Sequence, residues 1–254
     1  MNPFDLTGKV AIVTGGNGGI GLGIALGLAK AGASLAIVAR NAAKAEEAAR
    51  SIAAETGAKA IVATGDVASE ADCARVVEGV QSALGRIDIL FNNAGINIRK
   101  PPDSLGLDEW RQVMDINLTG AFLMSKAAHP AMKQAGGGKV INIGSMTSIF
   151  GSGFAPAYAA SKGGIVQLTK SCAIAWAPDK IQVNAILPGW FQTELTDQAR
   201  VEITGLYERV VARIPTGRWA QPADMAGTAV WLASSASDYV TRTRSPWMAA
   251  FGVL

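Results

Sequence analysis

The sequence has 254 residues, a hydrophobic fraction of 49% and a formal net charge of +3. Such a chain can bury the core of one large α/β domain, and a mild basic excess without a Lys/Arg run gives no reason to expect nucleic acid or an anionic membrane as partner. The N-terminal residues lack a signal-peptide pattern, and no apolar run approaches the roughly 18 residues that cross a bilayer, so we expect a cytoplasmic protein.

A glycine-rich turn follows the first predicted strand. Val10–Thr14 is a short β-branched strand, and an alanine- and leucine-rich helix runs on to about Lys30. The turn between them reads Gly15-Gly16-Asn17-Gly18-Gly19-Ile20-Gly21. Glycines permit positive φ and let backbone N–H groups approach a phosphate at the helix N-terminus. A plain strand–helix turn is the alternative, but the position between strand and helix favours a nucleotide site.

The end of the second predicted strand, Ser34–Ala39, bears on the choice of cofactor. In a dinucleotide site the residue at this distance is an acid for NAD or an arginine for the 2′-phosphate of NADP. Ala39 and Arg40 leave no carboxylate here, so NADP(H) is favoured over NAD(H). The alternative for Arg40 is a solvated residue at a helix start.

The alternation of strands and helices continues along the chain. A helix is predicted over Asn41–Thr56, followed by a strand over Lys59–Thr64 that ends in Gly65-Asp66-Val67. A helix then runs from the Ser69 cap to about Leu84, and a strand over Ile87–Phe91 runs into Asn92-Asn93-Ala94-Gly95. The next helix begins at Asp108, carries Asn117 and resumes to about Gln134. This alternation predicts an α/β protein with a Rossmann-like, doubly wound parallel sheet of about seven strands, helices on both faces, and one domain over residues 1–254.

The centre of the chain suggests proton transfer by a phenol. A buried strand, Lys139 to Gly144, ends in Ser145, and after a glycine-rich loop Pro156 opens a helix. Tyr158 and Lys162 are four residues apart on that helix, so both project from one face. A free tyrosine has a pKa of roughly 10, and an adjacent ammonium would lower it. The pair alone is a weak motif and needs the nucleotide site beside it.

The C-terminal third supplies the remaining elements. We expect a sixth strand over Ile181–Leu187, a lid over residues 190–215, a last helix over Pro222–Ala233, and the start of a final strand at Tyr239–Thr241. His129, the single histidine, precedes Pro130 on a helix and is expected to be a packing or surface residue. No metal site is expected, and both cysteines, Cys73 and Cys172, are interpreted as packing residues.

Taken together, these residues closely resemble the short-chain dehydrogenase/reductase family over roughly residues 7–241. Thr14-Gly15 with Gly19-Ile20-Gly21 is similar to the family's glycine motif, and Asn92-Asn93-Ala94-Gly95 to its fourth-strand motif. Asn117, Ser145, Tyr158 and Lys162 match its catalytic tetrad. The cofactor-binding set that the glycine turn, Arg40 and the resemblance indicate is Gly15, Asn17, Gly18, Gly19, Ile20, Gly21, Arg40, Asp66, Val67, Asn93, Ala94, Gly95, Tyr158, Lys162, Pro188, Gly189 and Thr193.

The resemblance implies an NAD(P)-dependent oxidoreductase that interconverts a secondary alcohol and a ketone by hydride transfer. Tyr158 would protonate or deprotonate the substrate oxygen, and Ser145 would hydrogen-bond that oxygen. Lys162 would lower the tyrosine pKa and hold the nicotinamide ribose, while Asn117 would anchor a water that links Lys162 to solvent. The resemblance also implies a homotetramer.

The substrate is less sharply indicated. The expected pocket is mostly apolar and is lined by Ile96, Asn97, Met146, Phe150, Phe154 and Trp190. Arg99 and Lys100 would receive a carboxylate, or are a solvated loop pair. Gly-Ile-Asn-Ile-Arg-Lys-Pro resembles family members acting on sugar acids such as gluconate or keto-deoxy-gluconate. The alternatives are a 3-oxoacyl thioester reductase, a broad carbonyl reductase and, in another class, a nucleotide-sensing regulator without turnover.

The C-terminal tail departs from the family pattern. The family usually closes with Gly-Thr-Ala-Ile-Pro-Val-Asp-Gly-Gly, whereas residues 242–250 read Arg-Thr-Arg-Ser-Pro-Trp-Met-Ala-Ala. Deleting one G from the third codon of GGG ACG GCG ATC CCC GTG GAT GGC GGC gives eight of these nine residues. We therefore interpret the tail as an out-of-frame reading that would weaken a tetramer more than catalysis, which resequencing the gene would test.

Overall fold

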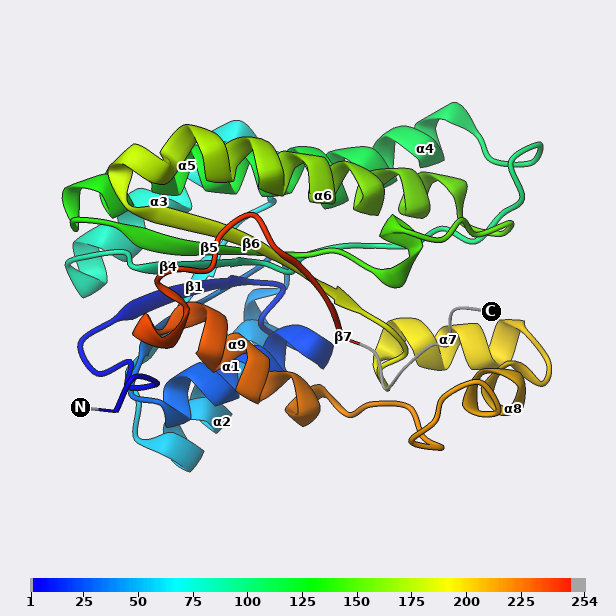
Figure 1. The fold of residues 1–254 in the computed structure, drawn as a ribbon, viewed down its shortest axis with the longest axis horizontal. Helices are drawn as coiled ribbons and strands as arrows, with labels where there is room; N and C mark the ends of the chain where they lie inside the picture. Colours follow the sequence, from blue (N-terminus) through cyan, green and yellow to red (C-terminus); the bar gives the residue numbers. More distant parts are fainter. Residues whose placement is uncertain (1, 248–254) are drawn as a thin grey trace.

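The computed structural model describes residues 2–247 of the chain (Figure 1). The strands are β1 (Val10–Thr14), β2 (Ser34–Ala39), β3 (Ala60–Thr64), β4 (Ile89–Asn92), β5 (Gly138–Ile143), β6 (Ile181–Pro188) and β7 (Arg244–Trp247). The α-helices are α1 (Gly19–Lys30), α2 (Ala42–Thr56), α3 (Glu70–Leu84), α4 (Leu107–Met114), α5 (Gly120–Gln134), α6 (Pro156–Trp176), α7 (Glu194–Glu202), α8 (Leu206–Val211) and α9 (Ala226–Ala233). These bounds agree with the predicted elements to within a few residues, apart from the last strand and from α7 and α8, which lie in the predicted lid and were not predicted as helices.

Within the described residues, the strands form one seven-stranded sheet in the order β3-β2-β1-β4-β5-β6-β7, and every pairing is parallel. The chain first builds outward from β1 to β3 and then restarts at β4 on the other side of β1. A doubly wound sheet binds ligands outside the carboxyl ends of the strands at such a reversal. The predicted fold class is confirmed, and the reversal fixes where a nucleotide site belongs.

Two apolar cores, one on each face of the sheet, hold the layers together (Figure 1). Alternate residues of one strand point to opposite faces. Accordingly, Ala11 and Val13 pack with α1, α2 and α9, whereas Val10 and Ile12 pack with α3, α5 and α6. Because both faces are covered, the central strands read as continuous apolar runs, which made them predictable.

The prediction of a final strand beginning at Tyr239–Thr241 is wrong. The last strand begins at Arg244, and Tyr239 is exposed. Arg242 has φ 63, a left-handed conformation that interrupts an extended chain. The Thr241 hydroxyl accepts from the Val183 N–H, so this segment approaches β6 before regular pairing starts.

The C-terminal segment that departs from the family pattern supplies the edge strand β7. It pairs with β6 through backbone groups, from Ala185 opposite Arg244 to Pro188 opposite Trp247. Pro246 lacks an N–H, which an edge strand tolerates. The out-of-frame interpretation stays a prediction, and Met248, Ala249 and Ala250 lie outside the described residues. None of the helices over residues 2–247 has the length and apolarity that spanning a bilayer requires.

Candidate functional site

The turn after β1 and the turn after β4 are bonded into one unit at the carboxyl edge of the sheet. The Thr14 hydroxyl accepts from the backbone N–H groups of Asn93 and Ala94, each at 3.0 Å. The Asn93 side-chain amide donates to the carbonyls of Thr14 and Gly15, at 3.0 and 3.2 Å. The Asn93 side chain therefore fixes the backbone at the start of the glycine turn through two hydrogen bonds.

This turn has the close backbone approaches of a phosphate-binding loop. Gly15 and Gly19 have φ of 64 and 50, which favours glycine. A Cβ on Gly21 would lie 2.2 Å from the Gly15 carbonyl oxygen. The first turn of α1 can therefore pack this closely against the end of β1 only because residue 21 is a glycine. The residues present therefore fit the pyrophosphate of a dinucleotide, which binds at a helix N-terminus.

A crevice of about 310 Å³ opens above the turn and collects most of the predicted cofactor residues. It is lined by Gly15, Asn17, Gly18, Gly19, Ile20, Asn93, Ala94, Gly95, Tyr158, Lys162, Pro188, Gly189 and Thr193. Four predicted residues are not in its lining. Gly21 is buried in α1, Val67 packs against Gly120, and the exposed Arg40 lies 3.7 Å from the Asp66 carboxylate.

Lys162 is held from two sides at the inner end of the crevice. Its Nζ donates to the Ile143 carbonyl at 2.7 Å, and its own carbonyl accepts from the Ser148 hydroxyl at 2.7 Å. Ser148 also accepts from the N–H of Ser145 at 3.1 Å, so it ties the strand end to α6. Ser148 was not among the predicted site residues, and its only signal in the sequence is its place three residues after Ser145.

Tyr158 and Ser145 meet beside this lysine, just beyond the end of β5. The Lys162 Nζ lies 5.6 Å from the centroid of the Tyr158 ring. Burial raises the pKa of the Tyr158 phenol, while a hydrogen bond with Ser145 and the charge of Arg99 act in the opposite direction. Burial also lowers the pKa of Lys162 to about 8. The expected lowering of the tyrosine pKa by Lys162 is therefore wrong for the protein alone, because desolvation outweighs the attraction of nearby positive charge.

Asn117 is buried at an irregular point of the helix layer. It lies in a π-helical turn, Asp115–Thr119, between α4 and α5, a feature that often marks functional sites. Its side chain accepts from the N–H of Ile96 at 2.8 Å and donates to the Ile96 carbonyl at 2.9 Å and to Ser161 at 3.1 Å. Asn117 therefore fixes the loop after β4, and the sequence did not indicate the π-turn.

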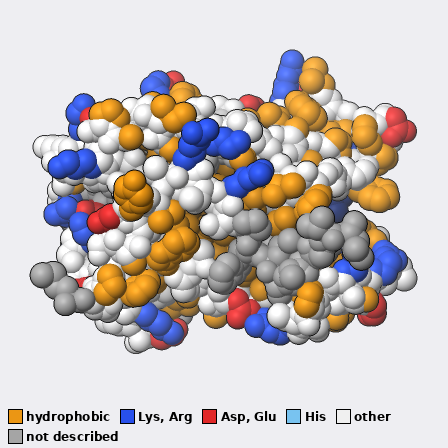
Figure 2. Space-filling view, in the orientation of Figure 1, with side chains coloured by type: hydrophobic (Ala, Val, Ile, Leu, Met, Phe, Trp, Pro, Cys, Tyr) orange, Lys and Arg blue, Asp and Glu red, His pale blue; other side chains and the backbone are white. Residues whose placement is uncertain are grey.

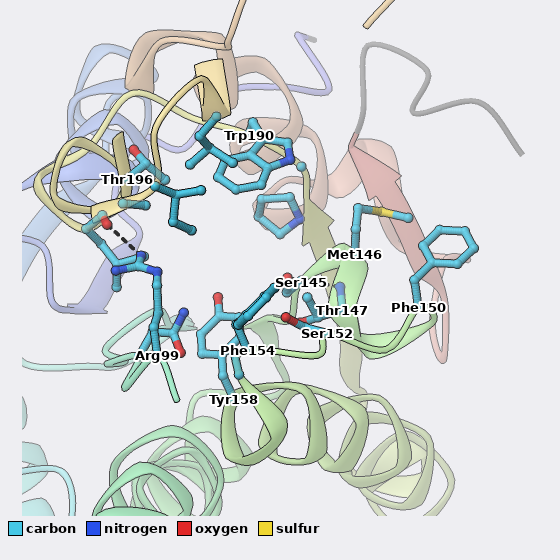
Figure 3. A pocket seen from close by; sticks show the side chains of 18 of the residues that line it. Arg99, Ser145, Met146, Thr147, Phe150, Ser152, Phe154, Tyr158, Trp190 and Thr196 are labelled. Carbon is cyan, nitrogen blue, oxygen red and sulfur yellow. Dashed lines mark hydrogen bonds between the residues drawn. The ribbon is translucent and has the colours of Figure 1, made fainter. Parts of the chain in front are cut away.

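A second cavity of about 540 Å³ adjoins Ser145 and Tyr158 (Figure 3). Of the six predicted pocket residues, five line it: Asn97, Met146, Phe150, Phe154 and Trp190. Ile96 does not, because its side chain packs into the core between the sheet and α3, α5 and α6. In Figure 2 hydrophobic side chains are exposed on this face of the molecule next to α4.

The structure separates the two basic residues after β4. Lys100 pairs with Glu109 at 2.6 Å. The Arg99 side chain, only 16% exposed, reaches into the pocket and bonds the Leu195 carbonyl at 2.8 Å and Glu202 at 3.1 Å (Figure 3). Of its five N–H donors these bonds use two. Arg99 is therefore a cation of the pocket wall, and it joins the β4 loop to α7.

Residues 190–215 cover one side of the pocket. Their apolar residues form a small cluster with Trp219, whose ring stacks on Trp190 at 5.1 Å. They contribute lining residues that were not among the predicted pocket residues, namely Leu195, Thr196, Ala199, Ile203, Leu206 and Arg213. For the four of these on α7 and α8, helical spacing was the available signal. Lys44 and Glu194 in the crevice were not predicted either.

Fold and site together define a doubly wound α/β protein with a dinucleotide crevice and a Ser–Tyr–Lys group at one end. Residues 9–203 match the model of the family described as short chain dehydrogenase. The chain is 42% identical over 241 residues to a 2-dehydro-3-deoxy-D-gluconate 5-dehydrogenase of Dickeya dadantii, covering 94% of each. It is 40% identical over 237 residues to a 5-keto-D-gluconate 5-reductase of Escherichia coli, covering 93% of this chain and 92% of that one.

A solved structure agrees. The gluconate 5-dehydrogenase of Burkholderia cenocepacia, in complex with NADP and tartrate, superposes with a TM-score of 0.93 at 39% identity, covering 98% of this chain and 97% of that chain. The chain belongs to the short-chain dehydrogenase family, as its motifs indicated.

Proposed function

We propose that the protein is an NADP(H)-dependent oxidoreductase that interconverts a secondary alcohol and a ketone in a sugar acid. The single observation that carries the substrate class is Arg99, a nearly buried cation that enters the pocket and acts electrostatically on the Tyr158 phenol. A buried guanidinium there suits a carboxylate, which it binds with charge-assisted hydrogen bonds. The names of the relatives, which act on gluconate derivatives, support the same class.

Two side-chain oxygens of residues that line the pocket have no hydrogen-bond partner, which supports a hydroxylated substrate. Among the described residues, the Asn97 Oδ1 and the Thr147 Oγ1 are buried without a hydrogen-bond partner, and both residues line the pocket. A buried polar group without a partner costs roughly 1–3 kcal/mol. Both atoms are shielded from water in the protein alone, so substrate hydroxyl groups would satisfy them once the two side chains turn toward the pocket, which an unfunctionalised ketone would not do.

The proposed roles follow from the contacts of each side chain. The bound nicotinamide would supply or accept the hydride. Tyr158 exchanges a proton with the substrate oxygen, and Ser145, which bonds the phenol, donates to the same oxygen. Lys162 places a positive charge 5.6 Å from the ring centroid, and this attraction opposes the desolvation of the phenolate without outweighing it in the protein alone. Asn117 keeps the β4 loop in position and anchors the water of the proposed proton relay.

The test is oxidation of NADPH, followed at 340 nm, with 5-keto-D-gluconate and with a neutral ketone. We expect turnover of the keto acid. Replacing a charge-assisted hydrogen bond loses about 1.5–3 kcal/mol, so Arg99→Met should raise the keto-acid KM roughly 10- to 100-fold while the KM of the neutral ketone stays the same. A change in kcat that comes from the lost charge beside the Tyr158 phenol should be equal for both substrates.

Two control variants isolate the carboxylate contact. Lys100→Met removes the neighbouring charge that pairs with Glu109, and Glu202→Gln removes the ion pair of Arg99 to α7 while keeping the guanidinium. Both should keep the KM of the wild type. Equal effects of Arg99→Met and Glu202→Gln would attribute the change to α7 and refute carboxylate binding. Tight nucleotide binding without any turnover would favour a nucleotide-sensing regulator.

The preference for NADP(H) rests on Arg40 and on the absence of an acid at the end of β2. Arg40 is exposed beside Asp66, at the carboxyl edge of the sheet, where a 2′-phosphate would reach it. The same assay with NADH tests this preference. A lower KM for NADH than for NADPH would contradict it.

A second candidate function has its own support in the pocket. Much of the wall opposite Arg99 is apolar, with Met146, Phe150 and Trp190 (Figure 3). Such a wall suits the chain of a 3-oxoacyl thioester or a broad range of carbonyl compounds. A higher kcat/KM for an oxoacyl ester than for any keto sugar acid would select this function.

We also propose a cytoplasmic homotetramer whose stability depends on the C-terminal tail. Phe122 on α5 and Ile174 on α6 are large apolar side chains left exposed, which is consistent with a contact between subunits. Light scattering after size exclusion gives the mass. A tetramer that is unchanged when residues 242–250 are replaced by the family peptide would contradict the role of the tail.

A further inference from the structure

One ion pair crosses the mouth of the dinucleotide crevice. Lys44 lies in the first turn of α2, and Glu194 is the first residue of α7, 150 positions further along the chain. The Lys44 Nζ bonds the Glu194 Oε1. Both residues line the crevice together with the glycine turn and Thr193. The pair therefore connects the two walls between which a dinucleotide would enter.

The ammonium lies directly over the phosphate-binding turn. The Lys44 Nζ is 3.6 Å from the point that a Cβ of Gly18 would occupy. Gly18 is the N-cap residue of α1, where the helix dipole and free N–H groups create positive potential. A cation beside a positive helix end is unfavourable unless an anion lies with it. In the protein alone, the Glu194 carboxylate supplies that anion.

We propose that Lys44 is a phosphate-binding residue of the dinucleotide site. In the protein alone the Glu194 carboxylate forms an ion pair with the Lys44 ammonium, and a cofactor phosphate replaces that carboxylate when the dinucleotide binds. The inference rests on the dinucleotide binding of the proposed function. The Glu194 side chain is 80% exposed, and ion pairs this exposed contribute little stability. The whole pyrophosphate of a dinucleotide, like a 2′-phosphate, carries up to about two negative charges against one for the carboxylate, and would lie between Lys44 and the N-terminus of α1. The exchange is therefore favourable.

Glu194 does not lose all its partners when it releases Lys44. It lies in the first turn of α7, whose N-terminus is capped by Thr193, and a carboxylate is stabilised at a helix N-terminus. The exchange therefore needs no rearrangement of α7. It requires only that two flexible side chains rotate.

The experiment measures the Kd of NADP⁺ and of NAD⁺ by titration calorimetry, without turnover. We expect Lys44→Met to weaken NADP⁺ at least tenfold and Glu194→Gln to tighten it about two- to fivefold, since the competing carboxylate is removed. Lys30→Met is the matched control, because Lys30 pairs with Glu55 on the surface between α1 and α2 and does not line the crevice. Lys30→Met should leave both Kd values unchanged.

The two nucleotides distinguish the phosphates. Weaker binding of NADP⁺ alone in Lys44→Met would assign the ammonium to the 2′-phosphate, and equal weakening of both nucleotides would assign it to the pyrophosphate. Unchanged binding in Lys44→Met, or weakening by Glu194→Gln as large as that by Lys44→Met, would overturn the exchange while leaving the proposed function intact. A wild-type protein that binds neither nucleotide would overturn both.

Discussion

Because of Lys162, the free energy of unfolding of the wild type should rise with pH in the alkaline range, and this rise should be absent from the variant Lys162→Met. The side chain is 3% exposed, and burial lowers its pKa from 10.5 to about 8. Below about pH 8 the amine is protonated in both the folded and the unfolded chain, so the full cost of burying the charge is present. Between about pH 8 and 10.5 the unfolded chain binds more protons, and the free energy of unfolding rises with pH.

The magnitude follows from the two pKa values. Their difference, about 2.5, corresponds to about 3.4 kcal/mol at about 1.36 kcal/mol per unit. Most of this lies between pH 7.5 and 10, so the free energy of unfolding of the wild type should rise by about 2 kcal/mol over this range relative to Lys162→Met. The loss of the bond to the Ile143 carbonyl shifts the variant equally at every pH and cancels from this comparison.

Urea unfolding of both proteins at half-unit steps of pH measures the effect. Lys126→Met, which removes an exposed lysine from α5, corrects for the loss of one positive charge. A difference between wild type and Lys162→Met that stays constant with pH would refute the reasoning, because it would mean that Lys162 keeps its ordinary pKa when folded.

Two further predictions concern the site. Tyr158→Phe should reduce kcat by about 10²-fold or more while the Kd of the nucleotide stays within about twofold, because only the proton-transferring hydroxyl is lost; near-normal turnover would remove Tyr158 from the mechanism. Gly21→Ala should abolish nucleotide binding in calorimetry and lower the Tm, since its Cβ would meet the Gly15 carbonyl at 2.2 Å. The control Gly79→Ala, in open space on α3, should stabilise by about 0.5–1 kcal/mol, and equal behaviour of the two variants would disprove the close approach.

Hydrophobic pattern and turn chemistry alone determined most of the fold. The strands β1 and β2 and the helix cap at Ser69 lie where the sequence predicts them, because burial on both faces and local hydrogen bonds leave a direct mark on residue type. The spacing of Tyr158 and Lys162 works in the same way, since one helical turn fixes which side chains share a face.

Other features depend on contacts between distant segments, which no local pattern records. The assignment of Arg99 to the pocket and of Lys100 to Glu109 depends on where α7 and α4 pack. The pairing of Lys44 with Glu194 depends on two walls meeting across the crevice. The pKa of Tyr158 depends on how much water the packed loops exclude, and this desolvation reversed the direction expected from Lys162. Sequence determined which groups are present, and only the tertiary structure decided which of them lose water and which find a partner.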